Sequence, residues 1–390
     1  MRRLALAVSV AFLMFGPAVV AQNVDQEAIA KRLVAAAGIH EGDLVLVFGG
    51  VRDVGLLEDI AIQTRATGAF PLLALWSQRL SHDMYAKVPE RFDSQPPAMD
   101  LKLAEMLTAV ISVDIESEPG ALADIPAARR AASAQAGAPV GRLMMTRGVR
   151  QVNLGNGLYP TAGNATLFGI SRPELEKVFW AAVAVEPSRL QAAGTALKTA
   201  LGSGRELRLT GQNGTDLRMG IAARPVFVSD GFISPEEAKT GGAACSVWLP
   251  AGELYLAPVP GTAEGTVVVD RVVYQGQDIL GLSMVFKAGR LVSISARGGA
   301  FEPFKALYDV AGAGKDVFAL IDFGLNPALQ ISSGSRLQSY VPAGMVSVGI
   351  GDNTWAGGTN ESAYGFTFFL PGSTVTVDGK PIVEKGVLKQ

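Results

Sequence analysis

Three consecutive stretches decide the fold of the first part of the chain: EGDLVLVFGG (41–50), LLEDIAIQTRAT (56–67) and PLLAL (71–75). The first and third contain short apolar runs, of the kind found in strands that are buried in a sheet. The second has apolar residues at helical spacing and ends at Gly68. Strand, helix and strand in this order predict a βαβ unit, and with it the start of a parallel sheet.

The same rhythm continues on either side of this unit. Helical spacing predicts helices over 28–37, 100–107 and 125–134, and short apolar runs predict strands over 109–113, 143–145 and 151–154. Ser171, followed by Pro173 and Glu174, predicts the start of a helix that runs to about residue 185, and a second helix is expected over 188–201. We therefore expect an α/β domain with a doubly wound parallel sheet over residues 22–187.

The character of the sequence changes after Gly204. Asn213-Gly214 separates the runs 206–210 and 215–221, which is the pattern of a β-hairpin. Further strands are expected over 266–274, 282–286, 291–296 and 374–382. Residues 188–390 are therefore predicted to form a second, β-rich α+β domain.

The first 21 residues have the layout of a secretory signal. Arg2-Arg3 precedes an apolar run over 4–15, and Gly16-Pro17 leads to the small residues that end at Ala21. The run is shorter than the roughly 20 residues that span a bilayer. We expect cleavage after Ala21, no stable membrane anchor, and a periplasmic or secreted mature protein.

Composition excludes several classes of function. The formal net charge of -2 provides no basic surface, which argues against nucleic acid as a partner. Cys245 is the only cysteine, so no intramolecular disulfide can form. His40 and His82 are the only histidines, which excludes a His-rich metal site and leaves no histidine base beside a nucleophile. Gly49-Gly50 lacks the G-x-G-x-x-G spacing of dinucleotide-binding folds and is interpreted as a tight turn.

The segment LPAGELYLAP (249–258) is the richest candidate for a site, because a proline- and glycine-containing turn can aim Glu253 at a cleft. A solvated turn acid is the alternative. Two later stretches are similarly dense in glycine: DFGLNP (322–327), and GIGDNT (349–354) with GGTN (357–360). Such glycines allow close approach of backbone or ligand, although plain turn geometry explains each of them singly.

In this order, these motifs resemble the thermophilic metalloaminopeptidase family that includes aminopeptidase T. EGT (264–266), EGDLVL (41–46) and GTDL (214–217) fit the same pattern, so the resemblance covers most of the mature chain. It implies an α/β N-terminal domain, a C-terminal domain with a two-metal site, removal of N-terminal residues from peptides, and a homodimer.

The resemblance also implies where the metal ligands would be. Glu253 keeps the family's glutamate, whereas the other positions hold Leu320, Ser347, Gly365 and Thr367. Asp322 lies two residues after Leu320, on the same strand face, and is a residual candidate. Two neutral hydroxyls and two positions without a donor are poor replacements for carboxylate and imidazole ligands.

Two hypotheses follow. The first is a non-catalytic relative that binds a peptide or protein partner and has no cofactor. The alternative is an active aminopeptidase whose altered site holds Zn, Co, Mn or Mg through carboxylates. The carboxylates available to it are Glu253, Asp322, Asp352 and Glu361. A metal-free hydrolase ranks last, because no base is placed near a nucleophile.

Overall fold

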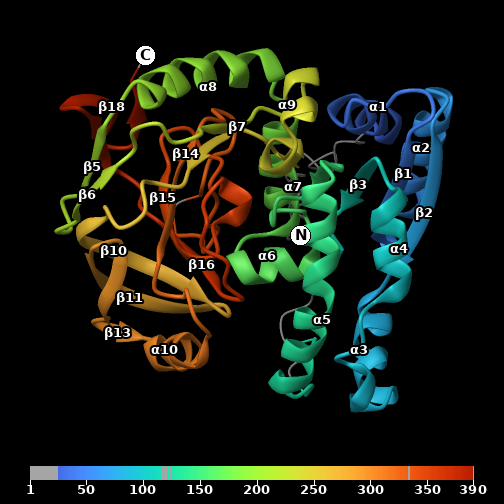
Figure 1. The fold of residues 1–390 in the computed structure, drawn as a ribbon, viewed down its shortest axis with the longest axis horizontal. Coiled ribbons are helices and arrows are strands. Elements are labelled where there is room, and N and C mark those ends of the chain that lie inside the picture. The colour runs from blue at the N-terminus through green and yellow to red at the C-terminus, as the bar shows by residue number, and fades with distance from the viewer. Residues whose placement is uncertain (1–24, 116–120, 123, 333, 390) are drawn as a thin grey trace, which may run out of the picture.

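The computed structural model describes residues 25–115, 121–122, 124–332 and 334–389 (Figure 1). The expected signal segment, residues 1–21, lies outside this part of the chain. Within the described residues, no helix combines the length and the hydropathy that crossing a bilayer requires.

A five-stranded parallel sheet organises the first part of the chain. Its order is β2-β1-β3-β4-β8, and every neighbouring pair is parallel. The strands are β1 (Leu44–Gly50), β2 (Phe70–Trp76), β3 (Ala109–Val113), β4 (Arg150–Leu154) and β8 (Ser246–Leu249). The predicted parallel α/β sheet is thus confirmed. The proposed domain boundary at residue 187 stays a prediction, and the fifth strand comes from beyond it.

The first eight α-helices of the described residues are α1 (Gln26–Ala36), α2 (Val54–Ala66), α3 (Gln78–Lys87), α4 (Ala98–Met106), α5 (Ala127–Thr146), α6 (Ala162–Phe168), α7 (Arg172–Val183) and α8 (Pro187–Gly202). The last of them, α8, lies over the second part of the chain and contacts its strands (Figure 1). The buried residues of α1 and α2, such as Leu33, Leu57 and Ile60, join one hydrophobic core with the inward side chains of β1 and β3. Ser171 caps α7 as expected, because its Oγ accepts a hydrogen bond from the Glu174 N–H.

The strand predicted over 143–145 is wrong. Leu143, Met144 and Met145 belong to the last turns of α5, which continues the helix predicted over 125–134 as far as Thr146. Three apolar residues in a row fit a helix as well as a strand, and Pro139, inside the helix, did not end it here.

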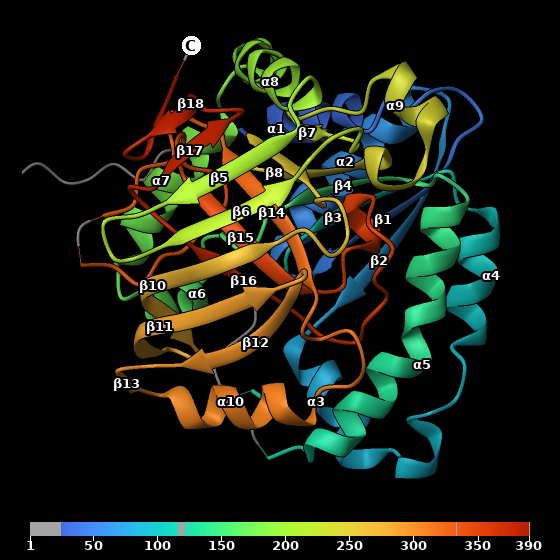
Figure 2. The ribbon, with the colours of Figure 1, turned by 60° about the vertical axis from the view of Figure 1, so that its left-hand side comes forward.

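Two antiparallel sheets stack in the second part of the chain (Figure 2). The nine-stranded sheet contains β5 (Glu206–Thr210), β6 (Asp216–Gly220), β10 (Glu264–Tyr274), β11 (Gln277–Lys287), β12 (Arg290–Ser295), β13 (Gly298–Gly299), β17 (Thr374–Val377), β18 (Lys380–Glu384) and β19 (Val387–Leu388). The five-stranded sheet has the order β16-β15-β14-β9-β7. Its members are β7 (Phe227–Ser229), β9 (Glu253–Leu256), β14 (Phe318–Gly324), β15 (Val346–Gly351) and β16 (Gly365–Phe369). Short helices α9 (Pro235–Thr240) and α10 (Phe301–Val310) complete the β-rich region that was predicted.

The single strand predicted over 374–382 is instead the hairpin β17–β18. Asp378 (φ 48°) and Gly379 (φ 82°) are both in the left-handed region and reverse the chain between them. Two successive positive φ values are the geometry of a tight hairpin turn, for which Asp-Gly is a favoured pair.

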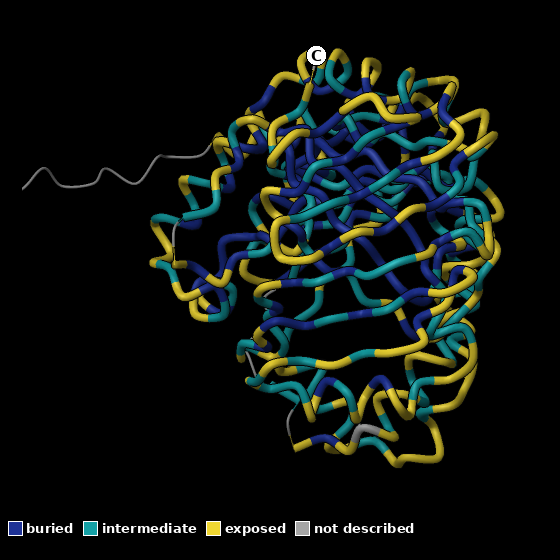
Figure 3. Tube along the Cα trace, turned by 90° about the vertical axis from the view of Figure 1, so that its left-hand side faces the viewer, coloured by how far each residue is buried: buried dark blue, intermediate teal, exposed yellow. Residues whose placement is uncertain are grey.

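The two antiparallel sheets enclose the larger core. Leu254, Leu256, Ile321 and Phe323 of β9 and β14 are fully buried in it, against strands of the nine-stranded sheet. Figure 3 shows buried and exposed positions alternating along the outer strands, with buried positions gathered between the layers. Because side chains alternate along a strand, the intervening residues of β9 and β14 point to the opposite face of their sheet.

Candidate functional site

That opposite face collects the candidate residues. In the antiparallel ladder Glu253 lies opposite Gly324, and Asp322 lies opposite both Tyr255 and Ser347. Residues paired across a ladder share a face, and so do residues two apart on one strand. The register continues from Leu320 to Gly349, from Gly349 to Thr367, and from Gly351 to Gly365. Glu253, Asp322, Leu320, Ser347, Gly365 and Thr367 therefore all lie on one face of one sheet.

Glu253 owes its position to the turn that precedes it. Gly252 has φ +119°, and a Cβ there would lie 2.8 Å from the Asn326 Cβ and 2.9 Å from the Asn326 backbone nitrogen. The Gly252 N–H donates to the Ser229 carbonyl at 2.9 Å, and its carbonyl accepts from the Leu325 N–H at 2.7 Å. A side chain at residue 252 would force these strands apart, so the glycine seats Glu253 at the start of β9.

Asn326 locks the other side of the turn. Its side-chain nitrogen donates to the carbonyls of Ala182 and Ala251 at 3.0 and 2.7 Å, and its Oδ1 accepts from the Ala328 N–H. The asparagine is fully buried and all of these bonds are to backbone. The Asn-Pro motif is therefore a structural clamp between the two parts of the chain, and it places Asp322 four residues upstream on β14.

The second glycine-rich motif is also a clamp. The Asn353 side-chain nitrogen donates to the Ala319 carbonyl at 3.0 Å, and its Oδ1 accepts from the Asn360 N–H at 2.9 Å. Asn360 in turn donates to the carbonyls of Gly314 and Gly351. A Cβ on Gly351, which has φ +97°, would lie 2.0 Å from the Tyr364 carbonyl oxygen. Turn geometry, the simpler interpretation of these glycines, is thus supported.

Two acidic side chains are buried side by side on the site face. Glu253 is 5% exposed and Asp322 is 2% exposed. Burial raises the pKa of Glu253 to about 7. Burial, and then the charge of Glu253, raise the pKa of Asp322 well above its ordinary value, which the Phe323 N–H only partly offsets. Desolvation of a carboxylate without a cationic partner is the physical cause.

Three polar atoms around this pair lack a hydrogen-bond partner among the described residues. They are Asp322 Oδ1, Ser229 Oγ and Ser347 Oγ. Ser229 pairs with Glu253 in the ladder, and Ser347 pairs with Asp322, so all three atoms belong to the same face. Unsatisfied buried polar groups are rare in folded proteins and mark either ordered water or a ligand.

Aromatic rings lie near the acidic pair. Tyr255 stacks on Phe227 with ring centroids 5.6 Å apart, and the centroid of the Trp355 ring lies 5.2 Å from that of Tyr255. Burial, followed by the charges of Glu253 and Asp322, raises the pKa of Tyr340, which hydrogen-bonds to Thr367. The ladder register places Phe227 and Tyr255 on the same face of the sheet as the acidic pair.

A cleft of about 350 Å³ opens on this side of the five-stranded sheet. Its walls include Leu320, Tyr340, Trp355, Gly365 and Thr367. Three of the positions where the resemblance implies metal ligands therefore line the cleft with an aliphatic side chain, a hydrogen atom and a hydroxyl. Ser347 is buried next to Asp322 rather than in the wall.

The further carboxylates of the alternative hypothesis do not join Glu253 and Asp322. Asp352 lines the cleft and accepts a hydrogen bond from the Thr354 hydroxyl. Glu361 is exposed and pairs with Arg142 at 3.3 Å. Within the described part of the chain, no three acidic, histidine or cysteine side chains are grouped as metal ligands would be.

This donor set does not fit a two-metal centre. Such a centre needs several carboxylate and imidazole ligands to hold ions roughly 3.5–4 Å apart. The face offers two carboxyl groups that burial drives towards the neutral form, and the hydroxyls of Ser347 and Thr367. Neutral hydroxyls are weak donors, and Leu320 and Gly365 contribute none.

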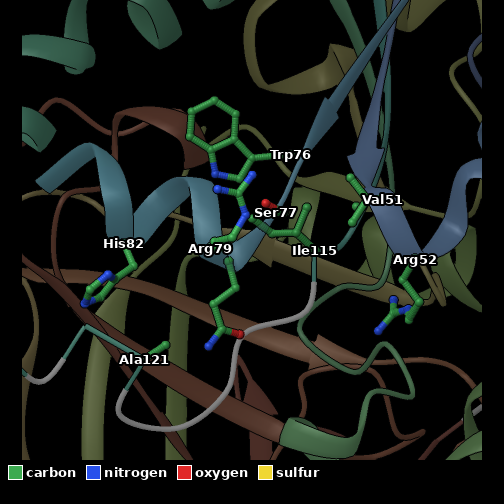
Figure 4. A pocket seen from close by; sticks show the side chains of 10 residues that line it. Val51, Arg52, Trp76, Ser77, Arg79, His82, Ile115 and Ala121 are labelled. Carbon is green, nitrogen blue, oxygen red and sulfur yellow. The ribbon is translucent and has the colours of Figure 1, made fainter. Parts of the chain in front are cut away.

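A second cavity, of about 540 Å³, lies at the carboxyl end of the parallel sheet (Figure 4). Gly50 and the turn after β1 form one side, as the tight-turn interpretation requires, with Arg52 beside them. Arg79 and His82 of α3 lie across from Arg52. Arg52 pairs with Asp53, Arg79 with Asp83, and His82 with Asp124. None of the candidate site residues is found here.

The remaining candidates have ordinary roles. Cys245 is fully buried, and burial raises the pKa of its thiol, which fits a small core residue. The ring of His40 is largely exposed beside Asp43. Asp43 itself is buried, and its carboxylate accepts hydrogen bonds from Arg150 at 2.6 Å and from the Thr108 hydroxyl at 2.8 Å. The aspartate therefore ties together the starts of β1, β3 and β4.

Four residues of the site were not predicted from sequence. Ser229 and Tyr340 come from segments without a motif, and Trp355 lies between the motifs GIGDNT (349–354) and GGTN (357–360). Only Tyr255 carried a signal, because it follows Glu253 by two residues on a predicted turn-strand segment and so shares its face.

Comparisons with known proteins agree with this fold. A family model described as thermophilic metalloprotease (M29) matches residues 26–309. The solved structure of wild-type AmpT from Thermus thermophilus is similar, with a TM-score of 0.72, 18% identity, and coverage of 94% of this chain and 99% of that one. The 2,5-dihydroxypyridine dioxygenase from Pseudomonas putida KT2440 has a TM-score of 0.61 and 14% identity, with 93% and 96% covered. At these identities the likeness establishes the fold alone. A sequence search of curated proteins gives no match.

Proposed function

Because the chain belongs to the thermophilic metalloprotease family M29, we propose that it is an exported, non-catalytic member that binds a peptide in the cleft of the five-stranded sheet. The observation that carries this proposal is the composition of one sheet face. Leu320, Ser347, Gly365 and Thr367 share that face with Glu253, and three of them line the cleft. A cleft that offers few metal donors is suited to binding rather than to hydrolysis.

The chemistry of the cleft favours a peptide with a free amino terminus. Among its described lining residues, Asp352 carries the only formal charge, and Glu253 and Asp322 are buried on the same face of the sheet. Tyr340 and Trp355 present rings towards the same space. An ammonium group is attracted both to carboxylates and to aromatic faces. The apolar walls then suit the first side chain of the peptide.

Peptide hydrolysis needs an activated water, which two metal ions would provide in a metalloprotease of this kind. Burial raises the pKa of Glu253 to about 7 and that of Asp322 well above its ordinary value, and no histidine of this chain is part of the site. These features support a protein that recognises the amino terminus and leaves the bond that follows it intact.

Export is part of the proposal and rests on the sequence of residues 1–21. A charged start, a short apolar run and small residues before the cleavage point support a periplasmic or secreted protein. Expression of the full chain, followed by cell fractionation and mass determination of the mature protein, tests this part separately.

Binding and catalysis can be tested on one preparation of the mature protein. Titration calorimetry with a hydrophobic tripeptide should give binding, and acetylation of the peptide's amino terminus should weaken it at least about tenfold, through loss of the charged contact. Asp352→Asn should also weaken binding, whereas Glu361→Gln, at an exposed carboxylate paired with Arg142, should not. The proposal fails if the two peptides bind equally, or if neither binds.

The alternative is an active aminopeptidase with a divalent metal on Glu253 and Asp322. The orphaned Oδ1 of Asp322, which lies buried beside a second carboxyl group, favours it. Release of free amino acid from the same tripeptide, in the presence of zinc, cobalt or manganese, would establish this alternative if Glu253→Gln abolished it. Absence of turnover under all three metals is the result that our proposal predicts.

A further inference from the structure

We propose that the cavity at the carboxyl end of the parallel sheet binds a small phosphate monoester whose organic part carries a flat ring, as a nucleoside monophosphate does. The cavity has a volume of about 540 Å³, which is within the range of small-molecule pockets and more than a phosphate group alone would fill. None of its described lining residues belongs to the cleft of the five-stranded sheet. This is therefore a second site, independent of the peptide that the cleft is proposed to bind.

The topology of the sheet places this cavity where α/β folds bind ligands. The chain passes from β1 through α2 to β2 on one side, and from β3 through α5 to β4 on the other. These connections leave in opposite directions, which opens a crevice between the carboxyl ends of β1 and β3. Gly50, the last residue of β1, and Ile115, two residues after β3, both line the cavity. The cavity therefore occupies this crevice.

The charged side chains that line the cavity are cationic. Arg52, Arg79 and His82 face it, and no acidic residue is among its described lining residues. Figure 4 shows Arg79 and His82 on α3, with Arg52 across the cavity from them. The Arg79 side chain is 81% exposed and places one nitrogen 3.3 Å from Asp83. A guanidinium has five N–H donors, so this contact leaves Arg79 able to bind an anion.

The acidic partners of the other two cations hold them in place from outside the cavity. Asp53 accepts two hydrogen bonds from Arg52, at 3.2 and 2.6 Å, and the Arg52 guanidinium lies 5.0 Å from the centre of the Tyr159 ring. The hydrogen bond to Asp124, and then its charge, raise the pKa of His82, which favours the imidazolium. Because these carboxylates partly neutralise the cations, we expect modest affinity, with a Kd below about 1 mM.

Helix α3 adds its positive end to the cavity. Ser77 caps this helix by accepting a hydrogen bond from the Leu80 N–H at 3.1 Å, and Ser77, Gln78 and Arg79 all line the cavity. The dipole of a helix favours an anion at its amino end. A phosphate monoester has three terminal oxygens, so it can contact the α3 side and Arg52 at once, whereas a carboxylate has two.

The remaining walls suit a flat organic group. Trp76, the last residue of β2, lines the cavity together with Val51 and Ile115. The Trp76 indole N–H donates to the Ser81 hydroxyl, which fixes the plane of the ring. Heteroaromatic bases stack on such rings with little dependence on their substituents. The turn after β1 lacks the glycine pattern of dinucleotide-binding folds, so we expect one phosphate group rather than a pyrophosphate.

The first experiment compares four probes on the mature full chain by titration calorimetry. They are adenosine monophosphate, adenosine, ribose 5-phosphate and inorganic phosphate. Adenosine monophosphate should bind, and removal of either its phosphate or its base should weaken binding at least about tenfold. The proposal is overturned if adenosine or inorganic phosphate binds as tightly as the nucleotide, or if the nucleotide does not bind at millimolar concentration.

Substitutions assign the site. Arg79→Ala should weaken binding of adenosine monophosphate at least about tenfold, with binding of adenosine and of the tripeptide unchanged. Arg172→Ala is the matched control, because Arg172 also lies in the first turn of a helix and pairs with an acid four residues later, Glu176, at 2.9 Å. Equal effects of these two substitutions, or competition between the nucleotide and the tripeptide, would contradict a separate site.

The ring contact is tested by Trp76→Leu, which should weaken binding of adenosine monophosphate and leave that of ribose 5-phosphate unchanged. An equal loss for both probes would contradict stacking on Trp76. Because the Arg79 side chain is largely exposed, Arg79→Ala keeps the phosphate contact testable even if Trp76→Leu folds poorly.

Discussion

Replacing Glu253 with glutamine should make the protein more stable at alkaline pH. The pKa of Glu253 is about 7 in the folded protein and ordinarily 4.5, because burial disfavours its charged form. For an acid with a raised pKa, the unfolded chain ionises first. Folding stability is therefore unaffected below about pH 4.5, falls as pH rises from there, and reaches its full loss above about pH 7.

The difference of about 2.5 pKa units corresponds to about 3 kcal/mol at pH 8. Glu253→Gln removes the ionisation and should recover up to that amount at pH 8, with little change at pH 5. The raised pKa of Asp322 acts in the same direction in the wild type, and the substitution should lower it by removing a neighbouring negative charge.

Urea unfolding at pH 5 and pH 8 measures this directly. The exposed Glu302→Gln on α10 is the matched control, and its unfolding free energy should differ from the wild type by little at either pH. A variant Glu253→Gln that is less stable than the wild type at pH 8 would refute the reasoning, because it would mean that a cation stabilises the ionised glutamate.

Three further substitutions test the packing around the site and the parallel sheet, each by urea unfolding. Ser347→Ala should cost nothing or stabilise by up to about 1 kcal/mol, because the lost hydroxyl has no partner; a clear destabilisation would indicate a bound water or ion. Arg150→Met should destabilise by about 3–5 kcal/mol, since it leaves Asp43 buried without its cation, and adding Asp43→Asn should restore part of the loss. Gly252→Ala should cost about 1–3 kcal/mol or more, because its Cβ would meet Asn326; an unchanged unfolding midpoint would contradict the close contact.

Local patterns were sufficient for most of the fold. The βαβ unit over 41–75 and the hairpin around Asn213-Gly214 formed as predicted, because spacing, turn residues and strand length agreed at each of them. The failures occurred where one signal stood alone. Residues 143–145 had an apolar run and no turn to bound it, and the run 374–382 concealed a turn at Asp378-Gly379.

The site was predictable only in part. Glu253 and Asp322 were each identified within a motif. The register between β9 and β14 places both side chains on one face of the sheet. That register itself is a tertiary feature, since it depends on contacts between segments about 70 residues apart. The same holds for Ser229 and Trp355, which reach the site from β7 and from the turn after β15.

The metal content of the mature protein is the most direct test. The protein would be saturated with zinc, cobalt and manganese in turn, dialysed, and measured by plasma mass spectrometry. Leu320→Glu, Ser347→His, Gly365→His and Thr367→Asp combined in one variant serve as the positive control, which should bind metal. We predict that the wild type keeps no stoichiometric metal. Near-stoichiometric metal in the wild type, lost on Glu253→Gln, would contradict the proposal that this cleft binds peptides without cleaving them.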